Sequence, residues 1–296
     1  MKPLVSIGLP VQNGFSDRSN KDLAVEDIDL SKTLNAILKQ NYTNLEIIIS
    51  NNCSTDQTQD YLEKISKTDN RIKLFNQKKE LSWAENFRFV LNKSTGKYFR
   101  WNAADDMISK DYIYHNIQFL ENNLDYVSSS SKCYYQNKPE IVHSYNLDKN
   151  LYHRIKAFFV IRDIAHNILY SLVRREAMYK TIDISEDYFA VDWTFDLDLL
   201  LCGKFKTLDK GHVFYGTKGL SKQKNFIDRD IYIKKKIYKL IPFYELMKNL
   251  FKKTIFLKEL SLLEKISIYY SLIRMNLHFL KMHRFIGLKK LLKKIK

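Results

Sequence analysis

Residues 97–106, KYFRWNAADD, decide the fold of this chain. Residues 97–101 predict a β-strand, because three of the five side chains are aromatic and aromatic residues are favoured in strands. Asn102 follows the strand directly, and after two alanines two adjacent aspartates, Asp105 and Asp106, close the stretch. In an open α/β sheet, ligands bind beyond the carboxyl ends of the strands. The stretch therefore predicts both a strand and the edge of a binding site.

The sequence before residue 97 alternates between strand and helix patterns. Strands are predicted at residues 4–9, 46–50 and 72–75. Helices are predicted from apolar residues at helical spacing at residues 30–38, 60–65 and 82–91. Pro10 is expected to stop the first strand. Strands that alternate with helices imply an α/β fold with a mostly parallel sheet flanked by helices.

Polar turns follow three of these strands, directly after Leu9, Ser50 and Trp101. Because the carboxyl ends of parallel strands lie at one edge of a sheet, the three turns form one candidate site. Asp105 and Asp106 repel each other there unless a cation joins them. Carboxylates are the ligands that Mg²⁺ and Mn²⁺ prefer, so a divalent ion is one interpretation of the pair. The other is a helix N-cap ahead of a helix at residues 112–120.

The positive charge of the chain is concentrated near its end. The net charge is +16, and residues 228–296 carry 18 Lys and Arg against 5 Asp and Glu. We therefore divide the chain into a nearly neutral domain, residues 1–227, and a basic amphipathic helical extension, residues 228–296. The extension either binds an anionic membrane surface or packs on the domain with a basic outer face. No nucleic-acid-binding motif accompanies its lysines, so nucleic acid is not an expected partner.

The remaining features of the sequence concern its compartment. Three scattered cysteines favour a reducing environment and argue against structural zinc. No secretory signal and no membrane-spanning segment is recognised. The sequence predicts a cytoplasmic protein, either free or peripheral on the inner face of the membrane.

Four blocks in order resemble family 2 glycosyltransferases of the GT-A (Rossmann-like) fold. They are residues 5–13, 40–49, 50–56 and 96–106. The resemblance implies transfer of a sugar, with inversion, from a nucleoside-diphosphate sugar to a hydroxyl of a glycan or lipid-linked acceptor. It favours a UDP-sugar donor, Mn²⁺ or Mg²⁺ as cofactor, and a role in surface polysaccharide synthesis.

The same resemblance assigns individual residues. It places the nucleotide against Pro10, Val11, Asn13, Asn51, Asp56, Asn86 and Asp105, and the metal against Asp105 and Asp106. Two residues depart from the family pattern: Asn51 stands where an Asp usually pairs with uracil, and Ala103 stands where the metal motif usually begins. These departures weaken the assignment of the base and of the metal.

The resemblance assigns the catalytic base to Asp192, which heads a predicted helix that ends in Gly203 and Lys204. The alternative for Asp192 is an N-cap, and Glu186 or Asp187 is the reserve base. Other polar and aromatic residues have the following interpretations. Arg174 or Arg175 contacts phosphate or forms a surface ion pair, Lys218 offsets diphosphate charge, and Trp83 and Trp101 stack on a ring or fill the core.

Two rival functions remain at this point. A nucleotidyltransferase of related fold would begin with a Gly-rich loop and a basic residue, which residues 9–14 lack. A catalytically impaired module that only binds a nucleotide sugar is compatible with Ala103 and Asn51.

Overall fold

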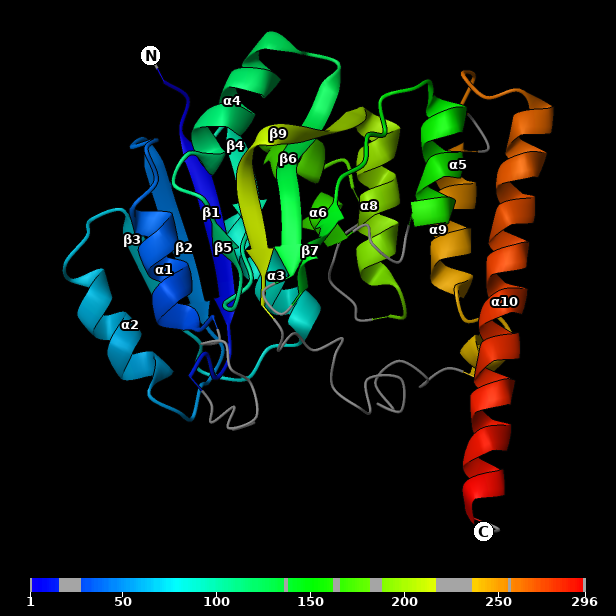
Figure 1. Ribbon diagram of the computed structural model, residues 1–296, viewed down its shortest axis with the longest axis horizontal. Coiled ribbons are helices and arrows are strands. Elements are labelled where there is room, and N and C mark those ends of the chain that lie inside the picture. Colours follow the sequence, from blue (N-terminus) through cyan, green and yellow to red (C-terminus); the bar gives the residue numbers. More distant parts are fainter. Residues whose placement is uncertain are drawn as a thin grey trace.

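In a computed structural model of the chain, the described residues form one mixed sheet of nine strands with helices on both faces (Figure 1). The structure describes residues 2–15, 28–135, 138–161, 166–181, 188–216, 236–254 and 257–294. The strands are β1 (Val5–Val11), β2 (Leu45–Asn51), β3 (Ile72–Asn76), β4 (Tyr98–Trp101), β5 (Met107–Ile108), β6 (Tyr126–Tyr135), β7 (Lys138–His143), β8 (Leu172–Arg174) and β9 (Lys204–Tyr215). Their order is β3-β2-β1-β4-β8-β6-β9-β5, and β7 pairs with β6 outside this path.

The helices lie between and around these strands. They are α1 (Leu30–Leu38), α2 (Thr58–Ser66), α3 (Trp83–Asn92), α4 (Tyr112–Asn122), α5 (Leu151–Ile161), α6 (His166–Leu169), α7 (Arg175–Met178), α8 (Val191–Cys202), α9 (Tyr244–Thr254) and α10 (Leu262–Lys294), with a 3-10 turn at Lys236–Lys239. All four strands and three helices predicted before residue 102 are present in the predicted order.

The first four strands form the parallel part of the sheet, since β1 pairs in parallel with both β2 and β4, and β2 pairs in parallel with β3. Pro10 does not stop β1, which continues to Val11 beside β2. The Gly8 carbonyl accepts from the Asn102 N–H just beyond the end of β4. In a strand, the backbone groups of every second residue face the same adjacent strand, so Pro10 faces the side of β4, as Gly8 does. Because β4 has already ended there, no hydrogen bond is lost by the missing N–H of Pro10.

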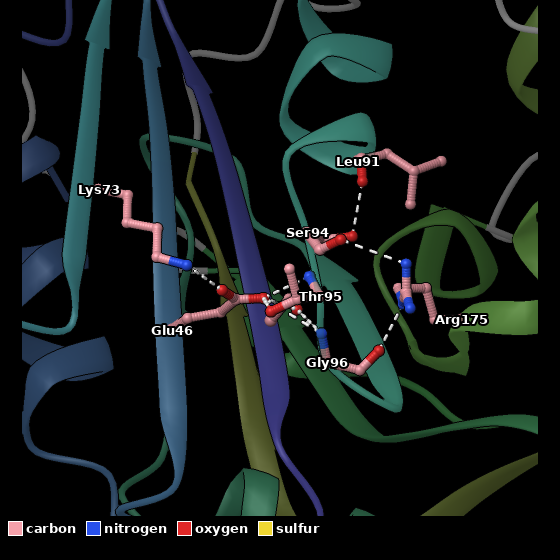
Figure 2. Close-up of polar contacts among 8 residues, drawn as sticks. Glu46, Lys73, Leu91, Ser94, Thr95, Gly96 and Arg175 are labelled. Carbon is pink, nitrogen blue, oxygen red and sulfur yellow. Dashed lines mark hydrogen bonds and ion pairs between the residues drawn. The ribbon is translucent and has the colours of Figure 1, made fainter.

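A buried carboxylate joins three segments at the end of the sheet opposite the polar turns (Figure 2). Glu46 Oε1 accepts from the Ser6 hydroxyl at 2.5 Å, the Thr95 N–H at 2.6 Å and the Gly96 N–H at 3.1 Å. Lys73 Nζ lies 2.6 Å from the other oxygen. Although burial alone would raise the pKa of Glu46, these hydrogen bonds hold it at about 2. Glu46 is thus a structural residue that fixes the entry into β4.

Replacing Glu46 with Gln is expected to lower the free energy of unfolding by about 2 to 3 kcal/mol at pH 7. The folded-state pKa lies below that of an unfolded Glu, so this stabilisation is present above about pH 4.5 and is lost as the pH falls towards 2. Urea unfolding at pH 7 and pH 3 should therefore show a smaller difference between variant and wild type at pH 3. The exposed Glu259→Gln serves as control; an equal loss in both variants would contradict the role of Glu46.

The second half of the sheet is largely antiparallel. β8 pairs antiparallel with β4 and β6, and β5 with β9, whereas β6 and β9 run parallel. The core is divided by the sheet. On one face α1 and α4 cover Ile7, Tyr98 and Cys133, and on the other α3, α5 and α8 cover Phe99 and Trp101.

The C-terminal helices extend the second of these cores. Phe243, Leu246 and Leu250 around α9, together with Ile268 and Leu272 of α10, are buried in the same apolar cluster as Trp101 and α8. Lys253 of α9 forms an ion pair with Asp198 of α8 at 2.6 Å. In Figure 1, α10 stands at the edge of the molecule and its C-terminal part projects past the other elements. Within the described ranges, no helix has the length and apolar character needed to cross a bilayer.

Candidate active site

The turn after β4 is held by Asn102. Its Nδ2 donates to the carbonyl of Ala103 at 2.8 Å and to that of Asp106 at 3.0 Å, so the amide closes the turn around Asp105. Asp111, not Asp105 or Asp106, occupies the N-cap of the next helix, α4. The helix-cap interpretation of the aspartate pair is therefore wrong.

The two aspartates pack against the end of β9. Asp106 is 6% exposed, and its Oδ1 accepts from the Gly216 N–H at 3.0 Å. A Cβ at position 216 would lie 2.3 Å from the Asp105 carbonyl and 2.7 Å from its Oδ2, so only glycine fits there. Gly216, the first residue after β9, thus holds Asp106 through its N–H, and the absence of a side chain lets its backbone approach that of Asp105.

Asp192 and the aspartates of this turn affect the pKa of the same tyrosine, Tyr170. Burial raises the pKa of Tyr170, and the negative charges of Asp106, Asp105 and Asp192 raise it further, in that order. The charges of all three carboxylates therefore act on one phenol, although Asp105 and Asp106 come from the turn after β4 and Asp192 comes from α8. Tyr170 lies in the segment after α6 and contacts Phe87 of α3. The sequence did not single out Tyr170, because a tyrosine among apolar residues has no signal that separates it from core.

The acidic residues of α8 have separate roles. Asp192 lies in the first turn, its Oδ1 accepts from the Trp193 N–H at 2.9 Å, and the N-cap is Ala190, with a positive φ of 62°. Asp198 is buried and bonded to Lys253 and Asn249, which makes it structural. Asp196 is also buried, and burial followed by the charge of Asp192 raises its pKa well above the usual range. Asp192 is the carboxylate of α8 that stands at the partly exposed start of the helix.

The loops after β1 and β2, where the sequence predicts nucleotide contacts, are joined to each other by hydrogen bonds. Asn13 has a left-handed backbone, donates its N–H to Ser54 Oγ at 2.9 Å and accepts from the Thr55 N–H at 2.8 Å. Asp56 accepts from the N–H groups of Phe15 and Thr58. These bonds join the two loops next to Pro10 and Val11, which end β1; nucleotide contact by these residues stays a prediction.

Asn51 and Asn86 are both buried next to this edge. The Asn51 side chain donates to Asn76 Oδ1 at 3.0 Å and accepts from the Ser54 N–H at 3.4 Å, and each of these bonds uses one of its two donor hydrogens or one of its two acceptor lone pairs. Asn86 lies on α3, whose start is fixed by a capping box between Ser82 and Glu85. Asn86 Oδ1 is buried and has no hydrogen bond to the described residues. An acceptor left open in this way suits a ligand hydroxyl or water.

Several predicted contacts lie elsewhere or outside the described residues. Arg174 donates to carbonyls at the end of α4, and Arg175 to those of Ser94 and Gly96 (Figure 2). Both side chains lie next to the start of β4, whereas Asp105 follows its end. The interpretation that either arginine contacts the phosphate of the donor is therefore wrong. Trp101 is fully buried and donates to the Phe87 carbonyl, whereas Trp83 packs on Phe87. Glu186, Asp187 and Lys218 lie outside the described residues.

A divalent ion at this site would have two protein carboxylates and would take its other ligands from water or from a bound diphosphate. Among the residues that the structure describes, no three His, Cys, Asp or Glu side chains are grouped to hold a metal. Asp105 and Asp106 offer two carboxylates beside Gly216. Mg²⁺ and Mn²⁺ sites in proteins often use one or two carboxylates and complete their coordination with phosphate oxygens and water. The pair therefore suits an ion that bridges to a diphosphate.

Solved structures share this fold. Residues 1–349 of TarS from S. aureus match with a TM-score of 0.65 at 14% identity, over 91% of this chain and 70% of that one. The TarS complex with UDP-GlcNAc matches with a TM-score of 0.57 at 15% identity, over 90% and 79%. Mannosyltransferase PcManGT from Pyrobaculum calidifontis, in complex with GDP-Man and Mn²⁺, matches with a TM-score of 0.54 at 13% identity, over 92% and 69%.

Sequence comparison identifies the family. A putative teichuronic acid biosynthesis glycosyltransferase, TuaG of Bacillus subtilis, is 30% identical over 119 residues, which is 40% of this chain and 42% of that protein. The chain spans less than half the length of the first curated relatives that it matches. The model of the family described as glycosyl transferase family 2 matches residues 28–182, just over half of the chain and including β2 to β8. From this match and the shared fold, the chain belongs to glycosyl transferase family 2.

Proposed function

We propose that the protein is an inverting glycosyltransferase that moves a sugar from a nucleoside-diphosphate sugar to an acceptor hydroxyl. The observation that supports this proposal is that the charges of Asp105 and Asp106, held beside Gly216, and the charge of Asp192, at the partly exposed start of α8, all act on the buried phenol of Tyr170. The acceptor oxygen attacks the anomeric carbon, the bond from that carbon to the diphosphate oxygen breaks, and the hydroxyl proton passes to Asp192. The nucleoside diphosphate leaves with the bonding electron pair. One displacement inverts the configuration, and no covalent nucleophile is needed.

The joined loops after β1 and β2 support a nucleotide on the side of Asn13 and Asp56. A UDP-sugar is the proposed donor, because the chain is similar in fold to TarS, which has been crystallised with UDP-GlcNAc. The acceptor class is proposed from the likeness to TuaG, whose name places it in teichuronic acid synthesis. A hydroxyl of a surface polysaccharide or of its lipid-linked precursor fits that likeness.

Asp105 and Asp106 are the proposed ligands of Mn²⁺ or Mg²⁺, which would offset charge on the leaving diphosphate. The likeness to PcManGT, crystallised with Mn²⁺, supports this assignment. Ala103 supplies no third carboxylate. Within the part of the chain that the structure describes, the protein's contribution to metal binding is therefore small, and the other ligands would be water or oxygens of the donor.

A panel of nucleotide sugars tests the proposed activity. Thermal shift identifies the donor, because a ligand that binds only the folded state raises its stability. Release of the nucleoside diphosphate is then measured with Mn²⁺ and with EDTA. Release from at least one donor supports the proposal. Binding without release would indicate the catalytically impaired module instead.

The C-terminal extension, residues 228–296, is the proposed membrane-binding part, placing the enzyme on the inner face of the membrane. One face of α10 packs on the domain through Ile268, Leu272 and Met275. The other face carries apolar side chains that are between 49% and 77% exposed, namely Leu262, Leu263, Ile266, Tyr270, Ile273 and Leu277. Exposed Arg274, His278 and Lys281 flank this stripe. An apolar stripe beside cationic groups suits an anionic lipid surface, which accepts both.

Deleting the extension is a poor test, because α9 and α10 cover the core around Trp101. We expect the full chain with Ile266, Ile273 and Leu277 all changed to Asn to bind vesicles of phosphatidylcholine and phosphatidylglycerol about tenfold or more weakly than wild type. Sedimentation with lipid vesicles measures this. Leu124→Asn with Val160→Asn, at exposed sites elsewhere, is the control. Equal binding by the triple variant and wild type would rule out the stripe.

A further inference from the structure

Arg100 is a buried cation directly behind the aspartate turn. It lies on β4, its side chain is fully buried, and it faces α4. Its Nη1 donates to the Tyr112 hydroxyl at 2.9 Å, and its carbon Cζ lies 4.6 Å from the centre of the Tyr112 ring. Nη2 is buried and has no hydrogen bond to any described residue. No carboxylate of the described residues forms an ion pair with this guanidinium. Burying a charge in this way costs several kcal/mol.

A short hydrogen-bonded path leads from Arg100 to the site. Nε of Arg100 donates to Asn102 Oδ1 at 3.3 Å. The amide nitrogen of Asn102 then donates to the carbonyls of Ala103 and Asp106, at either side of Asp105. The Arg100 guanidinium therefore binds Oδ1 of Asn102, while Nδ2 of the same side chain closes the aspartate turn.

The charge of Arg100 also affects the pKa values of two groups that the charge of Asp106 affects. Burial raises the pKa of the Cys133 thiol to about 12, and Arg100 opposes this rise while Asp106 adds to it. Tyr170 experiences the same two charges with the same signs. Arg100 and Asp106 thus lie near the same two groups. Because Arg keeps its proton in proteins, this positive charge is permanent.

We propose that Arg100 is a fixed counter-charge of the active site, which weakens divalent-cation binding at Asp105 and Asp106 and strengthens binding of the donor diphosphate. This inference rests on the proposed donor site. The permanent charge repels a second cation and attracts an anion, and the low dielectric of its surroundings makes both effects larger than in water. The protein supplies part of the positive charge that a metal would otherwise bring.

The test compares two substitutions that both remove the guanidinium but differ in charge. Arg100→Lys keeps the charge and Arg100→Met removes it; Arg100→Gln is a second neutral variant, used if the Met variant does not fold. Titration calorimetry measures Mn²⁺ binding without nucleotide, and UDP binding in EDTA. Relative to the Lys variant, the neutral variant should bind Mn²⁺ about fivefold more tightly and UDP about fivefold more weakly.

The two opposite signs separate this role from a merely structural one, because a loss of structure weakens both ligands. Equal or weaker Mn²⁺ binding together with unchanged UDP binding in the neutral variant would overturn the proposal. If no form of the protein binds UDP, with or without metal, the proposed donor site itself is wrong, and the role of Arg100 fails with it. If wild type binds UDP and the charge makes no difference, only the inference on Arg100 fails.

Discussion

Replacing Asp192 with Asn is expected to lower the rate of sugar transfer by about two to four orders of magnitude while leaving donor binding almost unchanged. Asn is close in shape to Asp, and its Oδ1 can still accept from the Trp193 N–H, so the start of α8 should be preserved. It cannot take the proton of the acceptor hydroxyl. The effect should therefore appear in kcat, with UDP affinity by calorimetry and the melting temperature close to wild type.

Asp198→Asn is the matched control for this prediction. Asp198 lies on the same helix, but its carboxylate is bonded to Lys253 and Asn249 of α9. Loss of the ion pair should lower the melting temperature and leave kcat near wild type at a temperature where the variant is folded. If Asp192→Asn kept more than about a tenth of the wild-type kcat, general-base catalysis by this residue would be excluded.

Replacing Asp106 with Asn should lower kcat by about two to three orders of magnitude and weaken Mn²⁺ binding about tenfold or more. The amide oxygen can still accept from the Gly216 N–H, so the contact with the end of β9 is kept and only the charge is lost. Calorimetry with Mn²⁺ in the presence of UDP, and the rate of UDP release, measure the two effects.

Asp209→Asn removes one carboxylate from the exposed surface of the same domain, where Asp209 pairs with Lys132. Its kcat and Mn²⁺ affinity should match those of wild type. If Asp106→Asn bound Mn²⁺ as tightly as this control, the metal would not be held by the aspartate turn.

The parallel half of the fold was predictable because its signals are local. Apolar strands such as β2 alternate with amphipathic helices, and each pattern is readable within a few residues. β6 has no such signal, because Ser128 to Ser131 form a polar run that is nonetheless fully buried. Ser129 bonds to Asn116 of α4, and Ser131 bonds to the Lys210 carbonyl of β9. A strand whose burial depends on partners from distant segments is not visible in the sequence alone.

In the candidate site, too, some residues were predictable from the sequence and others were not. The aspartate turn was predicted, because its residues follow the strand that leads to it. Arg174 and Arg175 were misplaced, because β8 runs antiparallel to β4 and sets them at the opposite end of the sheet. Arg100 was read only as part of a strand, because a charged side chain on the buried face of a strand looks the same in sequence as one that points to solvent.

The most direct test of the account is the configuration of the sugar released from its donor. We predict that the wild-type protein, given UDP-GlcNAc or the donor found by thermal shift, releases the sugar of an α-linked donor first as the β anomer, followed by proton NMR before mutarotation. Asp192→Asn should release it far more slowly. First appearance of the α anomer, or release at the wild-type rate by Asp192→Asn, would contradict inverting transfer with Asp192 as the base.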